Sequence, residues 1–156
     1  MIIASVLENQ KIEKRIAITP EIAKKYITLG FEVLLPENYA DHLGIKDSKY
    51  KEIGVMNSKD ENEIISKADV ILQLGLPSED KSSLLKENQT LIGVLNPYNN
   101  EDKINQLLKK KINVFSLELL PRITRAQSMD ILSSQANLAG YKAVIESFAN
   151  FEKAIP

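Results

Sequence analysis

Residues 121–135 concentrate side chains that could bind a ligand: arginines, amides, a carboxylate and several hydroxyls. The stretch follows an expected strand and opens an expected helix, the place where open α/β sheets bind ligands. On a helix, Gln127, Asp130 and Ser134, or Asp130 and Ser133, would share one edge at three- to four-residue spacing. Asp130 would also be favoured there by the helix dipole. The pattern therefore indicates a polar binding site.

A structural explanation of the same stretch stays open. Thr124 or Ser128 could cap the helix by accepting hydrogen bonds from its free backbone N–H groups. Arg125 could pair with Asp130 on the surface. Residue types and spacing alone do not separate a binding site from a capped helix.

Other familiar kinds of site are excluded or disfavoured by the sequence. The six glycines are too widely spaced for the cradle that approaches a dinucleotide pyrophosphate. There is no cysteine, and one histidine with scattered acids gives no metal-ligand spacing. The single histidine, His42, stands in a polar stretch and is expected to be a solvated surface residue.

Composition limits the class of protein. The 156 residues carry 20 basic and 21 acidic side chains, a net charge of −1, and 44% are hydrophobic. This describes a globular chain of one domain. A nucleic-acid partner would need a strongly basic face, so none is expected. The longest apolar runs are far shorter than the roughly 20 residues that cross a bilayer, so direct membrane insertion is not expected either.

Short apolar runs alternate with amphipathic segments along most of the chain. Strands are expected at residues 2–7, 31–35, 69–74, 90–95 and 112–117. Helices are expected at residues 20–29, 47–53, 61–68 and 101–110, with a short helix or turn at 82–86. Apolar strands separated by helices predict a doubly wound, mostly parallel α/β sheet with helices on both faces, flavodoxin-like or Rossmann-like.

Helical spacing also predicts which side chains face the core. The first helix should bury Ile22, Tyr26 and Leu29, begin at a Thr19 cap followed by proline, and end at Gly30. The helix at residues 101–110 should bury Ile104, Leu107 and Leu108.

The last segment is expected to form a long C-terminal helix. Residues 127–153 contain no proline, and one helix of that length would extend about 40 Å. Ile131, Leu138 and Ile145 recur every seven residues beside small side chains at 136, 139, 140 and 143. We therefore divide the chain into an α/β domain at 1–126 and an inter-domain helix at 127–156. A bent helix folded back on the sheet is the alternative.

Residues 121–143 closely resemble the signature of the proton-translocating NAD(P) transhydrogenase α subunit. Glu8, the run at residues 13–20 and the pattern at 40–54 resemble the superfamily that this enzyme shares with alanine dehydrogenase. The resemblance covers the whole chain, but only the first portion of the family's NAD(H)-binding component. The family's Gly-rich, nucleotide-binding Rossmann unit would begin soon after residue 156.

The resemblance implies hydride transfer from NADH to NADP⁺, coupled to proton translocation. Because hydride passes directly between two nicotinamide rings, positioning would supply most of the catalysis. Contact with the nicotinamide end of NAD(H) is implied for Arg122, Ile123, Thr124, Gln127, Asp130 and Ser133. Ile123 and Thr124 would act through their backbone, and the other four would align the reacting ring. Tyr141 would pack against a neighbouring domain or subunit.

The resemblance also implies partners and a location. The NAD(H)-binding component would be a homodimer that joins membrane-spanning and NADP(H)-binding components. It would be cytoplasmic and held at the inner membrane only through those partners. By itself, the chain is expected to be inactive and to bind NADH weakly or not at all.

Two other functions stay open. The first is an amino-acid oxidoreductase like alanine dehydrogenase. The resemblance places a lysine and a histidine of that enzyme at the positions of Gly75 and Asn96, which cannot replace them. Arg15 is kept, but by itself it is a weak signal. The second is a non-enzymatic assembly module that acts through the face at residues 136–143.

Overall fold

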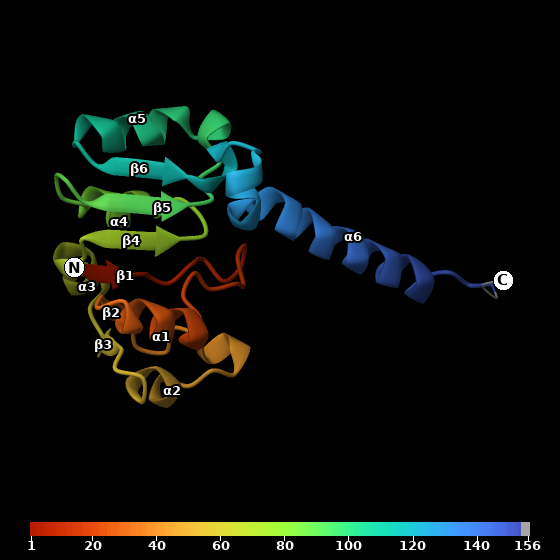
Figure 1. The fold of residues 1–156 in the computed structure, drawn as a ribbon, viewed down its shortest axis with the longest axis horizontal. Coiled ribbons are helices and arrows are strands. Elements are labelled where there is room, and N and C mark those ends of the chain that lie inside the picture. The colour runs from red at the N-terminus through yellow and green to blue at the C-terminus, as the bar shows by residue number, and fades with distance from the viewer. Residues whose placement is uncertain (154–156) are drawn as a thin grey trace. The chain divides into compact units, whose positions relative to one another are not determined.

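A six-stranded parallel sheet forms the core of the computed structural model, which describes residues 1–153 (Figure 1). The strands are β1 (Ile2–Ala4), β2 (Glu32–Pro36), β3 (Met56–Ser58), β4 (Val70–Gln73), β5 (Thr90–Gly93) and β6 (Asn113–Ser116). Their order across the sheet is β3-β2-β1-β4-β5-β6, and every neighbouring pair is parallel. This is the Rossmann order, which confirms the predicted doubly wound fold.

Helices connect successive strands. They are α1 (Pro20–Thr28), α2 (Asp47–Lys51), α3 (Glu61–Lys67), α4 (Glu79–Ser83) and α5 (Glu101–Lys109), with short 3₁₀ turns at Asp41–Leu43 and Pro97–Asn99. The predicted start and end of α1 are confirmed. Thr19 Oγ1 accepts a hydrogen bond from Ile22 N, and Gly30 takes a left-handed φ of 88° where the chain leaves the helix.

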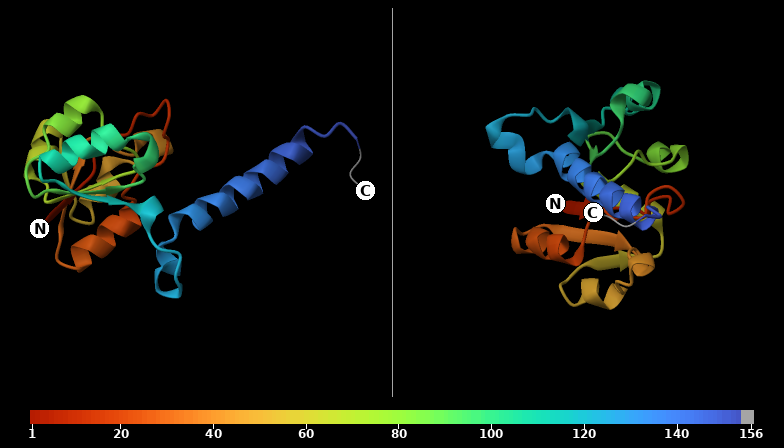
Figure 2. Two further views of the ribbon diagram at one scale, coloured as in Figure 1. Left: turned by 90° about the horizontal axis from the view of Figure 1, so that it is seen from above. Right: turned by 90° about the vertical axis from the view of Figure 1, so that its right-hand side faces the viewer.

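Each face of the sheet has its own core, because successive side chains of a strand point to opposite faces. Ile3, Val33 and Leu35 pack with residues of α1 and α2 on one face. Leu34, Ile71 and Leu91 pack with residues of α3 and α5 on the other. In the left view of Figure 2, α1 and α5 lie on opposite sides of the sheet. The prediction of helices on both faces is confirmed.

Strand β3 is not predicted from the sequence. Its three residues, Met56, Asn57 and Ser58, have neither an apolar run nor a clear alternation. Parallel pairing with β2 makes them a strand, with Leu34 opposite Met56 and Pro36 opposite Ser58. A tertiary contact, and not local propensity, specifies this edge of the sheet.

Two residues that are expected to face the core do not. Leu29 follows the last turn of α1 as its C-cap and is 71% exposed. Leu108 is 50% exposed, although its neighbour Leu107 is buried. Adjacent residues on a helix point about 100° apart, so only Leu107 falls within the narrow stripe that contacts the sheet.

The chain separates into two compact units, Met1–Ser116 and the segment that begins at Leu117. The second unit contains 3₁₀ turns at Leu117–Leu119 and Thr124–Met129, followed by α6 (Ile131–Ala149). The expectation that the helix begins at residue 127 is wrong, because Asp130 has a non-helical ψ of 89°. Helix α6 has 19 residues and is therefore about 28 Å long. The helix ends at Ala149, before the predicted end, and positions 154–156 of the predicted segment lie outside the described residues.

No residue of α6 is buried. From Leu132 onward its large apolar side chains, including Leu138, Ile145 and Phe148, are exposed to solvent. Among residues 1–153, no helix has the combined length and hydrophobicity that crossing a bilayer requires.

Candidate functional site

Asp130 and Ser133 form the best-defined contact in the predicted polar stretch. Asp130 Oδ1 accepts a hydrogen bond from Ser133 N at 3.0 Å, and Oδ2 accepts one from Ser133 Oγ at 2.6 Å. Asp130 is therefore the N-cap of α6, which excludes the alternative in which Thr124 or Ser128 caps the helix. These two hydrogen bonds lower the pKa of the Asp130 carboxyl, which stays ionised at neutral pH.

Arg122 is the cation beside this cap. Its Nε lies 3.9 Å from Asp130 Oδ2, close enough for attraction but too long for a direct hydrogen bond. Arg122 and Asp130 thus form a loose charged pair, and Arg122, not Arg125, is the arginine found beside Asp130. Most of the Arg122 side chain is exposed.

Gln127 does not share a helical edge with Asp130 and Ser134, in contrast to what the spacing indicates. It lies in the 3₁₀ segment Thr124–Met129, while Ser134 lies in α6. The backbone connects them through Asp130, whose N donates to Gln127 O at 3.3 Å and whose O accepts from Ser134 N at 3.3 Å.

Exposure is common to the remaining predicted residues. The side chains of Ile123, Thr124, Gln127 and Ser133 all face solvent, whereas Asp130 is half-buried. The structure therefore brings Asp130, Ser133 and Arg122 together and leaves the other three predicted residues on the surface of the second unit.

Arg15 and His42 lie in the first unit and have local partners. Arg15 Nε donates to Glu13 Oε1 at 2.8 Å, and its Nη2 donates to Glu13 Oε2 at 2.6 Å. This pairing lowers the pKa of Glu13. His42 is exposed, with Nε2 2.8 Å from Lys14 O and Nδ1 3.2 Å from Gln10 Nε2. The prediction of a surface histidine is confirmed.

A cavity of about 520 Å³ lies at the carboxyl ends of β1 and β4. These strands meet where the strand order reverses, the usual ligand position in an open α/β sheet. The cavity is lined by residues 7–9, 12, 13, 61, 73, 75–78 and 81. None of the six predicted site residues lines it. The sequence carries one overlooked signal: Gln73 is a polar residue inside an apolar strand.

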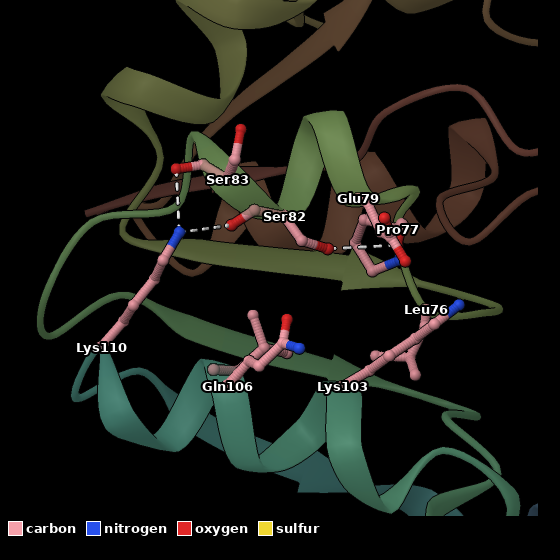
Figure 3. Close-up of a pocket in the computed structure, with 9 residues that line it drawn as sticks. Leu76, Pro77, Glu79, Ser82, Ser83, Lys103, Gln106 and Lys110 are labelled. Carbon is pink, nitrogen blue, oxygen red and sulfur yellow. Dashed lines mark hydrogen bonds between the residues drawn. The ribbon is translucent and has the colours of Figure 1, made fainter.

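A smaller cleft of about 180 Å³ separates α4 from α5 (Figure 3). Lys110, just after α5, reaches across it and donates to Ser82 O at 3.3 Å and Ser83 O at 3.0 Å. These carbonyls end α4, so Lys110 caps that helix from a neighbouring element. This cleft therefore has a structural explanation. Within the residues that the structure describes, no cluster of acids and histidine could hold a metal ion.

The strand order and the ligand-side loops define a Rossmann-type α/β domain. The model of the family described as "Alanine dehydrogenase/PNT, N-terminal domain" matches residues 5–139, and the chain belongs to this family. The family resemblance noted in the sequence is thereby confirmed.

The relatives above 30% identity are transhydrogenase subunits. An NAD(P) transhydrogenase subunit alpha protein of Rickettsia prowazekii is 42% identical over 160 residues, which cover the whole of this chain. Its counterpart from Rhodospirillum rubrum is 39% identical. This chain spans 42% of the length of each relative.

Solved structures agree with these matches. The transhydrogenase of Sinorhizobium meliloti superimposes with a TM-score of 0.91 at 37% identity, over all of this chain and 46% of that one. An L-alanine dehydrogenase superimposes over 76% of this chain with a TM-score of 0.70. At 18% identity, this second match shows only a common fold.

Proposed function

We propose that this chain is the N-terminal portion of the NAD(H)-binding component of a proton-translocating NAD(P) transhydrogenase. The observation that carries the proposal is the polar stretch 122–133, fixed at the start of α6 by the Asp130–Ser133 contact. Support also comes from the transhydrogenase relatives, which are about 40% identical over the full length of the chain.

The chemistry of this stretch suits positioning. Hydride transfer between two nicotinamides needs no proton from a side chain, and Asp130 has a lowered pKa that keeps it from donating one at neutral pH. Amide and hydroxyl groups such as Gln127 and Ser133 can bind a carboxamide or ribose in either redox state. We assign ring alignment to Arg122, Gln127, Asp130 and Ser133, and backbone contacts to Ile123 and Thr124.

The cofactor and partner assignments belong to the complete protein. NAD(H) would bind with the help of polypeptide beyond this chain, and NADP(H) would be held by a partner component. The complete component would be a homodimer, cytoplasmic and attached to the inner membrane through membrane-spanning partners. The division into an α/β domain at 1–126 and an inter-domain segment at 127–156, within which α6 covers Ile131–Ala149, belongs to the same proposal.

An amino-acid oxidoreductase is the weaker alternative. An alanine dehydrogenase of Staphylococcus aureus is 23% identical over 145 residues, well below the transhydrogenase relatives. Gly75 and Asn96 also lack the ammonium and imidazole groups that a carboxylate substrate and its proton would need. A purely structural assembly role would use the exposed apolar face of α6.

The test is an assay of the complete protein that contains this sequence, assembled with its partner components. We expect NADH-dependent reduction of an NADP⁺ analogue and no alanine-dependent reduction of NAD⁺. Alanine-dependent activity alone would establish the alternative enzyme. The absence of both activities in an assembled, folded complex would favour the structural role.

A further inference from the structure

Gln73 is a buried amide with one half of its side chain fixed. Its Oε1 accepts hydrogen bonds from Val6 N and from Ser5 Oγ, each at 3.1 Å. A backbone N–H can only donate, so the atom facing Val6 must be the oxygen. The orientation of the amide is thereby determined, and the NH₂ group lies on the other side.

The NH₂ group of Gln73 has no hydrogen-bond partner among the described residues. Gln73 is only 3% exposed. Among the described residues, Asn57 Oδ1 is the one side-chain atom found both fully buried and without a hydrogen-bond partner, so Gln73 Nε2 must keep some accessible surface. Gln73 lines the 520 Å³ cavity at the ends of β1 and β4. Since Gln73 lines this cavity, the cavity is the route by which a ligand would reach its two N–H donors.

The charges around the cavity disfavour an anionic ligand. Three carboxylates, those of Glu8, Glu13 and Glu61, line it against one ammonium, that of Lys81. Lys81 Nζ is held 2.9 Å from Glu61 Oε2 and also donates to Leu7 O at 2.9 Å. The positive charge of Lys81 is thus already balanced by Glu61 within the fold.

Glu8 is the acceptor that the cavity offers. Its Oε1 accepts from Leu74 N at 2.6 Å, and the Gly75 backbone N–H also interacts with the carboxylate. The Lys81 ammonium acts on it only at longer range, because Lys81 is paired with Glu61. A Cβ added at Gly75 would lie in van der Waals contact with the Glu8 carboxylate, 3.8 Å from Oε2, so a larger side chain there would occupy the space beside Glu8. Ile12, Leu76 and Pro77 add apolar surface to the same cavity.

We propose that this cavity binds a small uncharged primary carboxamide with an aliphatic body. The ligand carbonyl would accept from Gln73 Nε2, the ligand NH₂ would donate to the Glu8 carboxylate, and the apolar body would lie against Leu76 and Pro77. A volume of about 520 Å³ is within the range of small-molecule sites. All residues that line the cavity belong to the first unit, so this proposal does not rest on the proposed transhydrogenase function.

Three probes of similar shape and different charge test the ligand class: isobutyramide, isobutyrate and isobutylammonium. Each is titrated into the ¹⁵N-labelled chain while amide chemical shifts are recorded. We expect isobutyramide to shift the Gln73 side-chain amide and the backbone amides of residues 74–76, with saturation at millimolar concentration. Isobutyrate should shift them at least ~10-fold less at equal concentration. Equal shifts from isobutyrate or isobutylammonium, or none from isobutyramide, would overturn the proposal.

Two variants locate the site. Gln73→Glu keeps the acceptor for Val6 N and removes the NH₂ donors, so isobutyramide binding should be lost. Gly75→Leu fills the space beside Glu8 and should weaken binding ~10-fold or more. Gly140→Leu is the control, because nothing lies within 4 Å of a Cβ added there. If Gln73→Glu does not fold, Gly75→Leu decides: unchanged binding by this folded variant would rule out the cavity.

Discussion

Tyr39 donates a hydrogen bond from its hydroxyl to Ser5 Oγ at 2.9 Å, and both residues are buried. Ser5 Oγ in turn donates to Gln73 Oε1. The Tyr39 oxygen also accepts from Ala17 N at 3.1 Å and from Ile18 N at 3.2 Å. One hydroxyl thus links the loop before α1 to the ends of β1 and β4. This network holds Gln73 at the switch-point cavity.

Removing the Tyr39 hydroxyl should destabilise the fold. Tyr39→Phe leaves the N–H groups of Ala17 and Ile18 without an acceptor, so we expect the free energy of unfolding to fall by about 1–3 kcal/mol. Urea unfolding measures this loss. Tyr26→Phe is the matched control, because the Tyr26 hydroxyl makes no hydrogen bond among the described residues, and it should change stability by less than about 0.5 kcal/mol. Equal effects of the two substitutions would refute this role of Tyr39.

Gln89 should be equally hard to replace. Its buried Nε2 donates to Ile65 O and Ala68 O, both at 2.7 Å, and its Oε1 accepts from Lys86 N at 2.6 Å. Gln89→Met keeps the side-chain volume but leaves these three backbone groups without a hydrogen-bond partner, so we expect the free energy of unfolding to fall by about 2–4 kcal/mol. Gln106→Met is the control, because Gln106 is exposed at the cleft between α4 and α5, and it should be nearly neutral in the same urea measurement. A neutral Gln89→Met would show that water replaces the lost contacts.

The first turn of α6 should lose helical structure in acid. The pKa of Asp130 in the fold is below its ordinary value of 3.8, because Ser133 donates two hydrogen bonds to its carboxylate. The capping contribution is therefore complete above pH ~4 and is lost as the pH falls through the lowered pKa. We expect helical ¹³C shifts of residues 131–135 to be constant from pH 7 to 5 and to decline below about pH 4.

Two substitutions separate capping from charge at this position. Asp130→Asn should keep the cap and remove the pH dependence, since asparagine is also a good N-cap. Asp130→Ala should lose helical shifts at all pH values. If the wild-type shifts fell in acid together with those of Asp130→Asn, titration of Asp130 would not be the cause.

Glu8 should show the opposite pH dependence. Burial raises its pKa above the ordinary 4.5, so its ionised form is less favourable in the folded state than in the unfolded state. Its contribution is fully present below pH ~4.5 and is lost as the pH rises through the raised pKa. We expect Glu8→Gln to be more stable than wild type at pH 7, with the difference vanishing near pH 4.

The measurement is urea unfolding at both pH values, with Glu32→Gln as an exposed control. A Glu8→Gln protein that is less stable than wild type at pH 7 would mean that the Leu74 N–H needs a charged acceptor, contrary to this prediction.

The fold can be predicted from sequence where local patterns and burial agree. Apolar runs such as residues 90–95 are sufficient to place five strands. Start signals such as Thr19–Pro20, together with helical spacing, place the main helices. Strand β3 escapes prediction because its polar residues become a strand only through pairing with β2. Leu29 and Leu108 are predicted to face inward because they are apolar, although each lies outside the buried stripe of its helix.

Prediction of the site is limited by backbone conformation. Residue types identify the stretch 122–133, but helical spacing does not apply to Gln127 and Asp130, which precede α6. The switch-point cavity escapes prediction because its residues come from distant segments, and no local spacing relates Glu8 to Gln73. Strand order, which only the structure supplies, brings them together.

The central claim is that residues 122–133 align a nicotinamide ring. The most direct measurement is single-turnover hydride transfer in the complete enzyme, compared with the equilibrium Kd for NADH, for Gln127→Ala and Asp130→Asn. We predict that the transfer rate falls ~10-fold or more while the NADH Kd changes less than ~3-fold, because misalignment acts on the transition state. Equal losses in rate and affinity, or no change in either, would contradict that role.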